Sequence, residues 1–243
     1  MELNRIGKGL CKMKAMRYLS TFFLLLTGLI FFLPLSRAEH PPAKPLVVID
    51  PAHGGSDKGV KLSDSENEKD IALKIALLLE KELQIRGNVR VQLTRISDRD
   101  MPVAERIKMV RGSGARMFIS LHINAGFGKN AAGYEVYFPG FRDTPANQKG
   151  AAEIVRDMAE NKYLNGSVAL AQVILRNLQN VFPRKGRGLR NAPVPVLEGL
   201  NLPAVAVEVG FASNPDDKKT ITGDSGQRAI AQALSRSIEE FFH

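Results

Sequence analysis

The stretch 45–57 (PLVVIDPAHGGSD) constrains the fold of this chain more than any other. Its apolar residues 46–49 predict a short buried strand, and the proline and paired glycines that follow predict a sharp polar turn. His53 lies within that turn. Because ligands bind in the crevice beyond the carboxyl ends of the strands of an open α/β sheet, this histidine is well placed for chemistry.

Apolar strands and amphipathic helices alternate along the rest of the chain. Further strands are expected at 90–94, 117–124, 133–138 and 203–210. Apolar residues at helical spacing predict helices at 68–86, 102–111, 148–162, 167–181 and 225–242, with a turn at 163–166 between the third and the fourth. The segment 190–197 is extended but contains two prolines, so an edge strand or a loop is expected there. This alternation predicts an α/β fold, a single layered domain whose mostly parallel central sheet is flanked by helices.

Residues 1–38 have the three parts of an export signal, namely a basic start, an apolar run at 22–33 and a small-x-small cleavage site at 36–38. A membrane-spanning helix needs about 20 apolar residues, and this run is interrupted by Thr27, Gly28 and Pro34. Cleavage is therefore favoured over retention as a membrane anchor, and no stable membrane insertion is expected after it. The expected organisation is a signal peptide over 1–38 and one folded domain over 39–243.

Charge and cysteine content restrict the classes of partner. The chain has a formal charge of +9, but the leader carries six of its 34 basic and one of its 25 acidic residues, which leaves +4 for 39–243. With this mild charge, an export signal and no nucleic-acid motif, no nucleic-acid partner is expected. The basic cluster at 184–190 is more typical of a solvated loop than of a site for an anionic polymer. The single cysteine, Cys11, lies in the leader, so the domain depends on its hydrophobic core rather than on disulfides.

Two histidines, His53 and His122, lie at the ends of expected strands that face the same crevice. Glu68 lies at the start of the first expected helix. A catalytic zinc ion commonly has three protein ligands drawn from His and Asp or Glu, and these three residues supply such a set. Each also has a structural interpretation, because a lone histidine is usually structural and a carboxylate is favourable at a helix N-terminus.

Glu208 lies inside the apolar strand 203–210, on the face opposite Val205, Val207 and Val209. Burying an ionised carboxylate in a strand costs several kcal/mol unless the group is paired or serves a site. A structural salt bridge is one interpretation of this residue. The other is that Glu208 acts near a zinc ion as the general base that takes a proton from water.

Seven motifs occur in one order along the chain: VVIDPAHGG, ENEKDIALKIA, LTRISDRDMPVAERI, FISLHINA, GYEVYF, SVALAQVILRNL and PAVAVEVGFASNPDD. In residue type, order and spacing they resemble those of the zinc-dependent N-acetylmuramoyl-L-alanine amidases of the type 3 family. The resemblance covers nearly all of the chain after the leader. It implies that 39–243 is a zinc amidase catalytic domain.

The resemblance also implies roles for individual residues and a substrate. His53, Glu68 and His122 would be the ligands of a Zn²⁺ cofactor, and Glu208 would be the catalytic acid/base. The reaction would be hydrolysis of the amide between N-acetylmuramic acid and L-alanine in peptidoglycan. A cell-wall hydrolase of this kind would be exported to the periplasm or secreted to the wall, and an activator protein is a candidate partner.

The chain departs from the family pattern in few places. Ala52 stands where the family usually has glycine, and alanine fits there if its φ is negative. The expected helix at 148–162 is a candidate to cover part of the site. Arg95, Asp98 and Arg106 are interpreted as a structural ion-pair network at the rim of the sheet, without a catalytic role.

Two other functions are consistent with the same fold. One is a wall-binding module that clamps glycan or regulates other hydrolases without catalysis, although all four expected site residues are present. The other is a zinc peptidase that cleaves a peptide bond within the stem peptide. The products distinguish them, because an amidase releases a peptide that begins at L-alanine and leaves the sugar intact.

Overall fold

The structure is a computed structural model that describes residues 43–126, 128, 130–140, 151–182 and 186–243, with the backbone alone for 151–160 and 187. The expected signal peptide, 1–38, lies outside the described residues. The described residues from Lys44 to His243 form a single α/β unit. No helix within the described ranges is long and apolar enough to cross a membrane.

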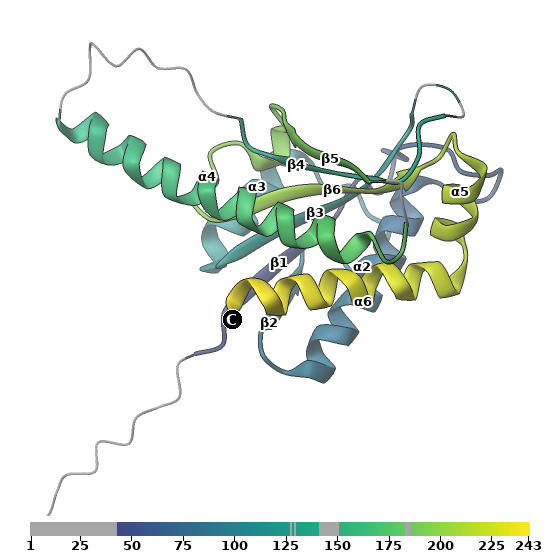
Figure 1. Cartoon of the computed structure of the whole chain (residues 1–243), viewed down its shortest axis with the longest axis horizontal. Coiled ribbons are helices and arrows are strands. Elements are labelled where there is room, and N and C mark those ends of the chain that lie inside the picture. The colour runs from purple at the N-terminus through teal and green to yellow at the C-terminus, as the bar shows by residue number, and fades with distance from the viewer. Residues whose placement is uncertain (1–42, 127, 129, 141–150, 183–185) are drawn as a thin grey trace, which may run out of the picture. The chain divides into compact units, whose positions relative to one another are not determined.

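A six-stranded sheet runs through the middle of the fold (Figure 1). Its strands are β1 (Leu46–Pro51), β2 (Arg90–Leu93), β3 (Met117–Asn124), β4 (Tyr134–Phe138), β5 (Gly186–Asn191) and β6 (Ala204–Phe211). In space they follow the order β2-β1-β3-β6-β4-β5, and every neighbouring pair is parallel except β4 and β6. The predicted α/β fold with a mostly parallel sheet is therefore confirmed.

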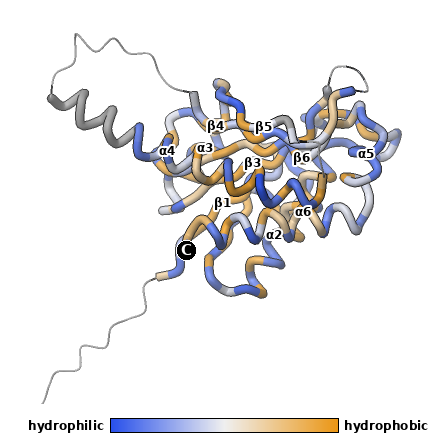
Figure 2. Tube along the Cα trace, viewed as in Figure 1, coloured by the Kyte–Doolittle hydropathy of each residue, from blue (hydrophilic) through white to orange (hydrophobic). Residues whose placement is uncertain are grey.

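Helices cover both faces of this sheet. They are α2 (Glu68–Arg86), α3 (Val103–Ser113), α4 (Ala151–Leu178), α5 (Pro215–Thr222) and α6 (Asp224–Phe242), together with the 3₁₀ turn η2 (Pro195–Leu197). Buried residues of α2, α4 and α6 pack in the larger core on one face, whereas α3 and η2 close a smaller core on the other. Apolar residues are concentrated along the central strands β1, β3 and β6 (Figure 2).

Side chains alternate between the two faces of the sheet along β3, and the site lies on the face opposite the larger core. Met117, Ile119 and Leu121 belong to the larger core, whereas Phe118 belongs to the smaller one. Successive side chains of a strand point to opposite faces, so His122 shares the face of Phe118. The site therefore lies on the side of α3, at the carboxyl ends of β1 and β3.

Helix α4 is continuous, which differs from the two helices expected at 148–162 and 167–181. The expected turn at 163–166 contains Gly166, and glycine costs about 1 kcal/mol inside a helix relative to alanine. Here a Cβ at Gly166 would lie 2.8 Å from Cγ of Pro203. Glycine is therefore accommodated in α4 because it lets the helix approach the segment before β6 closely.

Strand β5 lies where the sequence favoured a solvated loop. It covers most of the basic cluster 184–190 and pairs in parallel with β4 at the edge of the sheet. An edge strand is thus present, but it ends at Asn191 instead of continuing through 197. Pro193 and Pro195 lack the N–H needed for a ladder, and Pro195 begins η2 instead.

Helix α5 occupies a segment in which the sequence patterns indicated no helix. Its N-terminus is capped by Asn214, whose side-chain oxygen accepts from the backbone N–H groups of Asp216 and Asp217. Pro215 follows as the first helical residue, where its missing N–H has no consequence. Such a short helix is determined by its cap more than by apolar periodicity.

We predict that Leu79→Ala lowers the free energy of unfolding by about 2–5 kcal/mol, because truncating a fully buried leucine removes apolar contacts and leaves a cavity. Leu77 lies in the same helix but is 40% exposed, so Leu77→Ala is expected to cost less than about 1 kcal/mol. Urea unfolding of the two variants measures the difference. Equal losses would contradict the packing of α2 against the sheet.

Candidate metal centre

The turn after β1 holds His53 in an unusual backbone conformation. His53 has a φ of 59°, and it is the only non-glycine residue with positive φ in the described part of the chain. Positive φ is uncommon outside glycine. Ala52, where glycine was expected from the resemblance, does not have positive φ, so its methyl group introduces no strain there. The next residue must be glycine, because a Cβ at Gly54 would lie 2.3 Å from the carbonyl oxygen of Arg99.

Two buried arginines hold this turn through its backbone carbonyl groups. Arg95 donates from Nη2 to the carbonyl oxygen of Ala52 at 2.8 Å, and from Nε to that of Pro51 at 2.9 Å. Arg106 donates to the carbonyl oxygens of Pro51 at 2.9 Å and His53 at 2.5 Å. The carbonyl groups of Ala52 and His53 lie beyond the end of β1, and that of Pro51 belongs to its last residue. The guanidinium groups therefore satisfy oxygens that burial would otherwise leave without partners.

The network expected among Arg95, Asp98 and Arg106 has different pairings. Arg106 pairs with the buried Asp50. Asp98 instead pairs with Lys69, with 2.6 Å between Oδ2 and Nζ, and accepts from the backbone N–H of Gly55 at 2.7 Å. All three residues hold the His53 turn in place, but they do so separately.

Glu68 is the first residue of α2, and its carboxylate is buried, with 2% of the residue exposed. Its Oε2 accepts from the backbone N–H of Val60 at 3.0 Å, and its Oε1 accepts from that of Ile123 at 2.9 Å. Gly59 makes room for it, since a Cβ there would lie 2.6 Å from Oε2 of Glu68 and 2.7 Å from Cδ2 of His53. Each of the two carboxylate oxygens of Glu68 is therefore held by a backbone N–H group.

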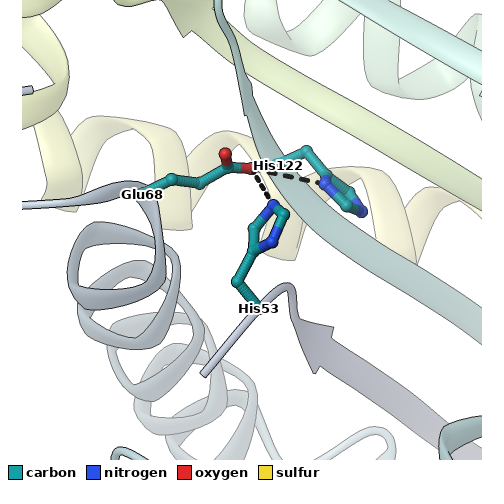
Figure 3. A group of neighbouring side chains, drawn as sticks. All are labelled: His53, Glu68 and His122. Carbon is teal, nitrogen blue, oxygen red and sulfur yellow. Dashed lines mark ion pairs between the residues drawn. The ribbon is translucent and has the colours of Figure 1, made fainter. Parts of the chain in front are cut away.

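His53, Glu68 and His122 converge from three separate segments (Figure 3). Oε1 of Glu68 lies 3.0 Å from Nε2 of His53 and 3.3 Å from Nδ1 of His122. The two imidazole rings are almost perpendicular, with 5.6 Å between their centroids. One potential ligand atom from each residue lies within 4.8 Å of the other two. Two nitrogens and one carboxylate oxygen in this arrangement match the donor set of a catalytic zinc site.

The charges of the three residues depend on one another. Burial alone would lower the pKa of His53, but the hydrogen bond and charge of Glu68, together with Asp57, raise it to about 9. Burial alone would raise the pKa of Glu68, but the adjacent imidazoles of His122 and His53 lower it to about 2. Glu68 is therefore ionised at neutral pH and stabilises positive charge at the position where the imidazoles meet it.

Glu208 lies on β6 beside this group. Its register partners are His122 on β3 and Glu135 on β4. Its Oε2 is buried and has no hydrogen-bond partner among the residues that the structure describes. Burial, with a further contribution from the charges of Glu68 and Glu135, raises the pKa of Glu208 to about 7, although the charge of His122 opposes this. The structure thus places an acid that can accept or donate a proton near neutral pH next to His122.

Two further carboxylates near the site were not identified from the sequence. Asp57 accepts from Nδ1 of His53, with 2.8 Å between that atom and Oδ2. Glu135 is buried, and its carboxylate accepts from the hydroxyl group of Tyr137 at 2.9 Å and from Nη2 of Arg190 at 3.2 Å. A signal was present for Glu135, because an acid within the apolar strand YEVYF is as unusual as Glu208 within PAVAVEVG.

A cavity of about 280 Å³ opens beside the two histidines. His53 and His122 contribute to its lining together with the apolar side chains of Met101, Val103 and Val196. Sites for organic ligands typically combine an apolar wall with a few polar groups. The cavity therefore leaves room for a ligand group next to the three converging side chains.

Comparison with known proteins places this geometry in a family. The family model described as N-acetylmuramoyl-L-alanine amidase matches residues 47–240. Among characterised relatives, the amidase AmiA of Escherichia coli strain K12 is 26% identical over 230 residues, which cover 85% of this chain and 79% of the relative.

Solved structures give the same result. The amidase AmiC2 of Nostoc punctiforme matches with a TM-score of 0.68 and 27% identity, over 82% of this chain and 98% of that one. The CwlD amidase from Clostridioides difficile, solved in complex with the GerS lipoprotein, matches with a TM-score of 0.65 and 25% identity, over 82% and 98% of the two chains. The chain therefore belongs to the N-acetylmuramoyl-L-alanine amidase family of cell-wall hydrolases.

Proposed function

We propose that this amidase is zinc-dependent, with His53, Glu68 and His122 as the metal ligands and Glu208 as the catalytic acid/base. The observation that carries the proposal is the convergence of two imidazole nitrogens and one buried carboxylate oxygen within 4.8 Å. The buried Oε2 of Glu208, which has no hydrogen-bond partner among the described residues, supports it further. A zinc ion held there would polarise the scissile carbonyl and make water acidic enough to attack at neutral pH.

The residues of the chain would then carry the proton transfers. Glu208 accepts a proton as the oxygen of water bonds to the lactyl carbonyl carbon of N-acetylmuramic acid. Glu208 then donates that proton to the nitrogen of L-alanine as the carbon–nitrogen bond breaks. The products are the free lactyl carboxylic acid of the sugar and a peptide with a free amino terminus. A pKa raised by burial suits both transfers, because the group gains and loses a proton readily near neutral pH.

Peptidoglycan lies outside the cytoplasmic membrane, so this activity requires export. The leader at 1–38, with its basic start, apolar run and cleavage site, supplies the signal for it. We infer that the enzyme acts in the periplasm or at the wall. A related amidase was solved in complex with a lipoprotein, which supports the expectation of a protein partner.

Glu208→Gln is predicted to lower kcat by about 10²–10⁴-fold, the usual contribution of a general acid/base, while the protein still binds one zinc ion. Mass spectrometry of digested peptidoglycan measures activity and bond choice together, and metal analysis measures zinc content. Glu240→Gln is the matched control, because Glu240 lies on α6 in an exposed ion pair with Arg176.

Three outcomes would contradict parts of the proposal. Full activity of Glu208→Gln would remove this residue from the mechanism. Products cut within the stem peptide would identify a peptidase instead of an amidase. Binding of peptidoglycan without release of any product, with zinc and candidate activators present, would indicate a wall-binding module.

Zinc binding is predicted to release protons at pH 7.5. The pKa of His53 is raised to about 9 in the metal-free protein, so its imidazole is protonated at this pH, whereas a zinc ligand must be neutral. Zinc affinity should therefore rise with pH up to about 9. Calorimetric titrations in buffers of different ionisation enthalpy report the number of protons released, and a binding enthalpy that does not depend on the buffer would contradict the prediction.

A further inference from the structure

The two nitrogens of His122 have different surroundings. Nδ1 faces Oε1 of Glu68 at 3.3 Å, the position at which the proposed zinc site forms. Nε2 faces the hydroxyl group of Ser120 at 3.1 Å. Ser120 is fully buried and lies two residues before His122 on the same face of β3. The ring orientation of His122 therefore involves Ser120 as well as Glu68.

Ser120 contacts a second buried group, the carboxylate of Asp50. The two residues are register partners on the neighbouring strands β3 and β1, and the hydroxyl group of Ser120 donates to Oδ2 of Asp50 at 2.7 Å. Oδ1 of Asp50 accepts from the hydroxyl group of Thr94 at 2.5 Å, and Asp50 is also paired with the guanidinium group of Arg106. All three groups donate to Asp50, so its carboxylate serves only as a hydrogen-bond acceptor.

The direction of each hydrogen bond follows from this carboxylate. A serine hydroxyl group has one proton, and that of Ser120 is donated to Asp50. Towards His122, the oxygen of Ser120 can therefore only accept, so the proton of that hydrogen bond belongs to Nε2 of His122. A neutral imidazole that carries its proton on Nε2 has its lone pair on Nδ1, the atom that faces Glu68.

We propose that Ser120 and Asp50 form a positioning relay that keeps His122 in the tautomer that binds metal through Nδ1. His53 is oriented differently, because its Nδ1 donates directly to Asp57 and its Nε2 faces Glu68. The two histidines thus present different nitrogens to the same ion. The inference rests on the proposed zinc site and assigns to Ser120 and Asp50 the part that carboxylate partners of metal-bound histidines play elsewhere.

Arg106 connects the relay to the other histidine. It pairs with Asp50 and also donates to the carbonyl oxygen of His53 at 2.5 Å. One buried side chain therefore contacts both the relay behind His122 and the turn that carries His53. The relay fixes the position of one ligand relative to the other as well as the tautomer.

Nuclear magnetic resonance of the zinc-loaded, ¹⁵N-labelled wild-type protein tests the tautomers without any substitution. We expect the ¹⁵N shifts to show His122 protonated at Nε2 and metal-bound at Nδ1, and His53 protonated at Nδ1 and metal-bound at Nε2. A metal-bound Nε2 in His122 would overturn the proposal.

Ser120→Ala tests the relay, and Thr94→Val is its matched control. Each substitution removes one hydroxyl donor from Asp50, but only Ser120 lies between that carboxylate and His122. Loss of a partner of a metal-bound histidine typically weakens metal affinity about 10–100-fold. We expect this increase in the zinc Kd for Ser120→Ala and a change of less than about 3-fold for Thr94→Val, with affinity measured by competition with a chelator.

The outcomes separate this inference from the proposed function. Wild-type protein that binds zinc, with equal affinity in Ser120→Ala, would overturn the relay and leave the zinc site standing. Wild-type protein that binds no zinc would overturn both. Circular dichroism and thermal unfolding establish that each variant is folded, and the wild-type resonance measurement decides the case if Ser120→Ala does not fold.

Discussion

The site depends on the contacts that the buried carboxylate of Glu68 makes with its partners. An ionised carboxylate loses several kcal/mol of solvation when it is buried, and the loss must be offset by partners. Backbone N–H groups of Val60 and Ile123 and the imidazoles of His53 and His122 provide them. These partners come from the loop before α2, from β3 and from the turn after β1, so one carboxylate links segments that are far apart in the sequence.

Periodicity and the alternation of strands and helices predict the sheet and identify candidate site residues, and the family resemblance implies their roles. Alternation in β3 and β6 assigns the apolar side chains to the core and leaves His122 and Glu208 on the other face, as observed. The carboxyl ends of parallel strands lie at one edge of a sheet, so His53 and His122 are expected to be neighbours. The position of Glu68 at a helix N-terminus also fits a structural carboxylate, and the family resemblance assigns this residue to the site.

Features that depend on contacts between distant segments could not be predicted in this way. Gly166 indicates a helix break in the sequence, but it instead allows close packing of α4 on Pro203. The partners of Asp50 and Ser120 depend on the register of β1 against β3, which periodicity does not determine. The basic cluster at 184–190 contains two glycines and four positive charges, so the pairing of Gly186–Asn191 with β4 could only be established from the structure.

A crystal structure of the zinc-loaded protein, with diffraction recorded at the zinc absorption edge, tests the central claim most directly. The account predicts one anomalous peak at about 2.0–2.2 Å from Nε2 of His53, an oxygen of Glu68 and Nδ1 of His122. Binding of zinc elsewhere, with Glu68 still in direct contact with both imidazoles, would contradict it.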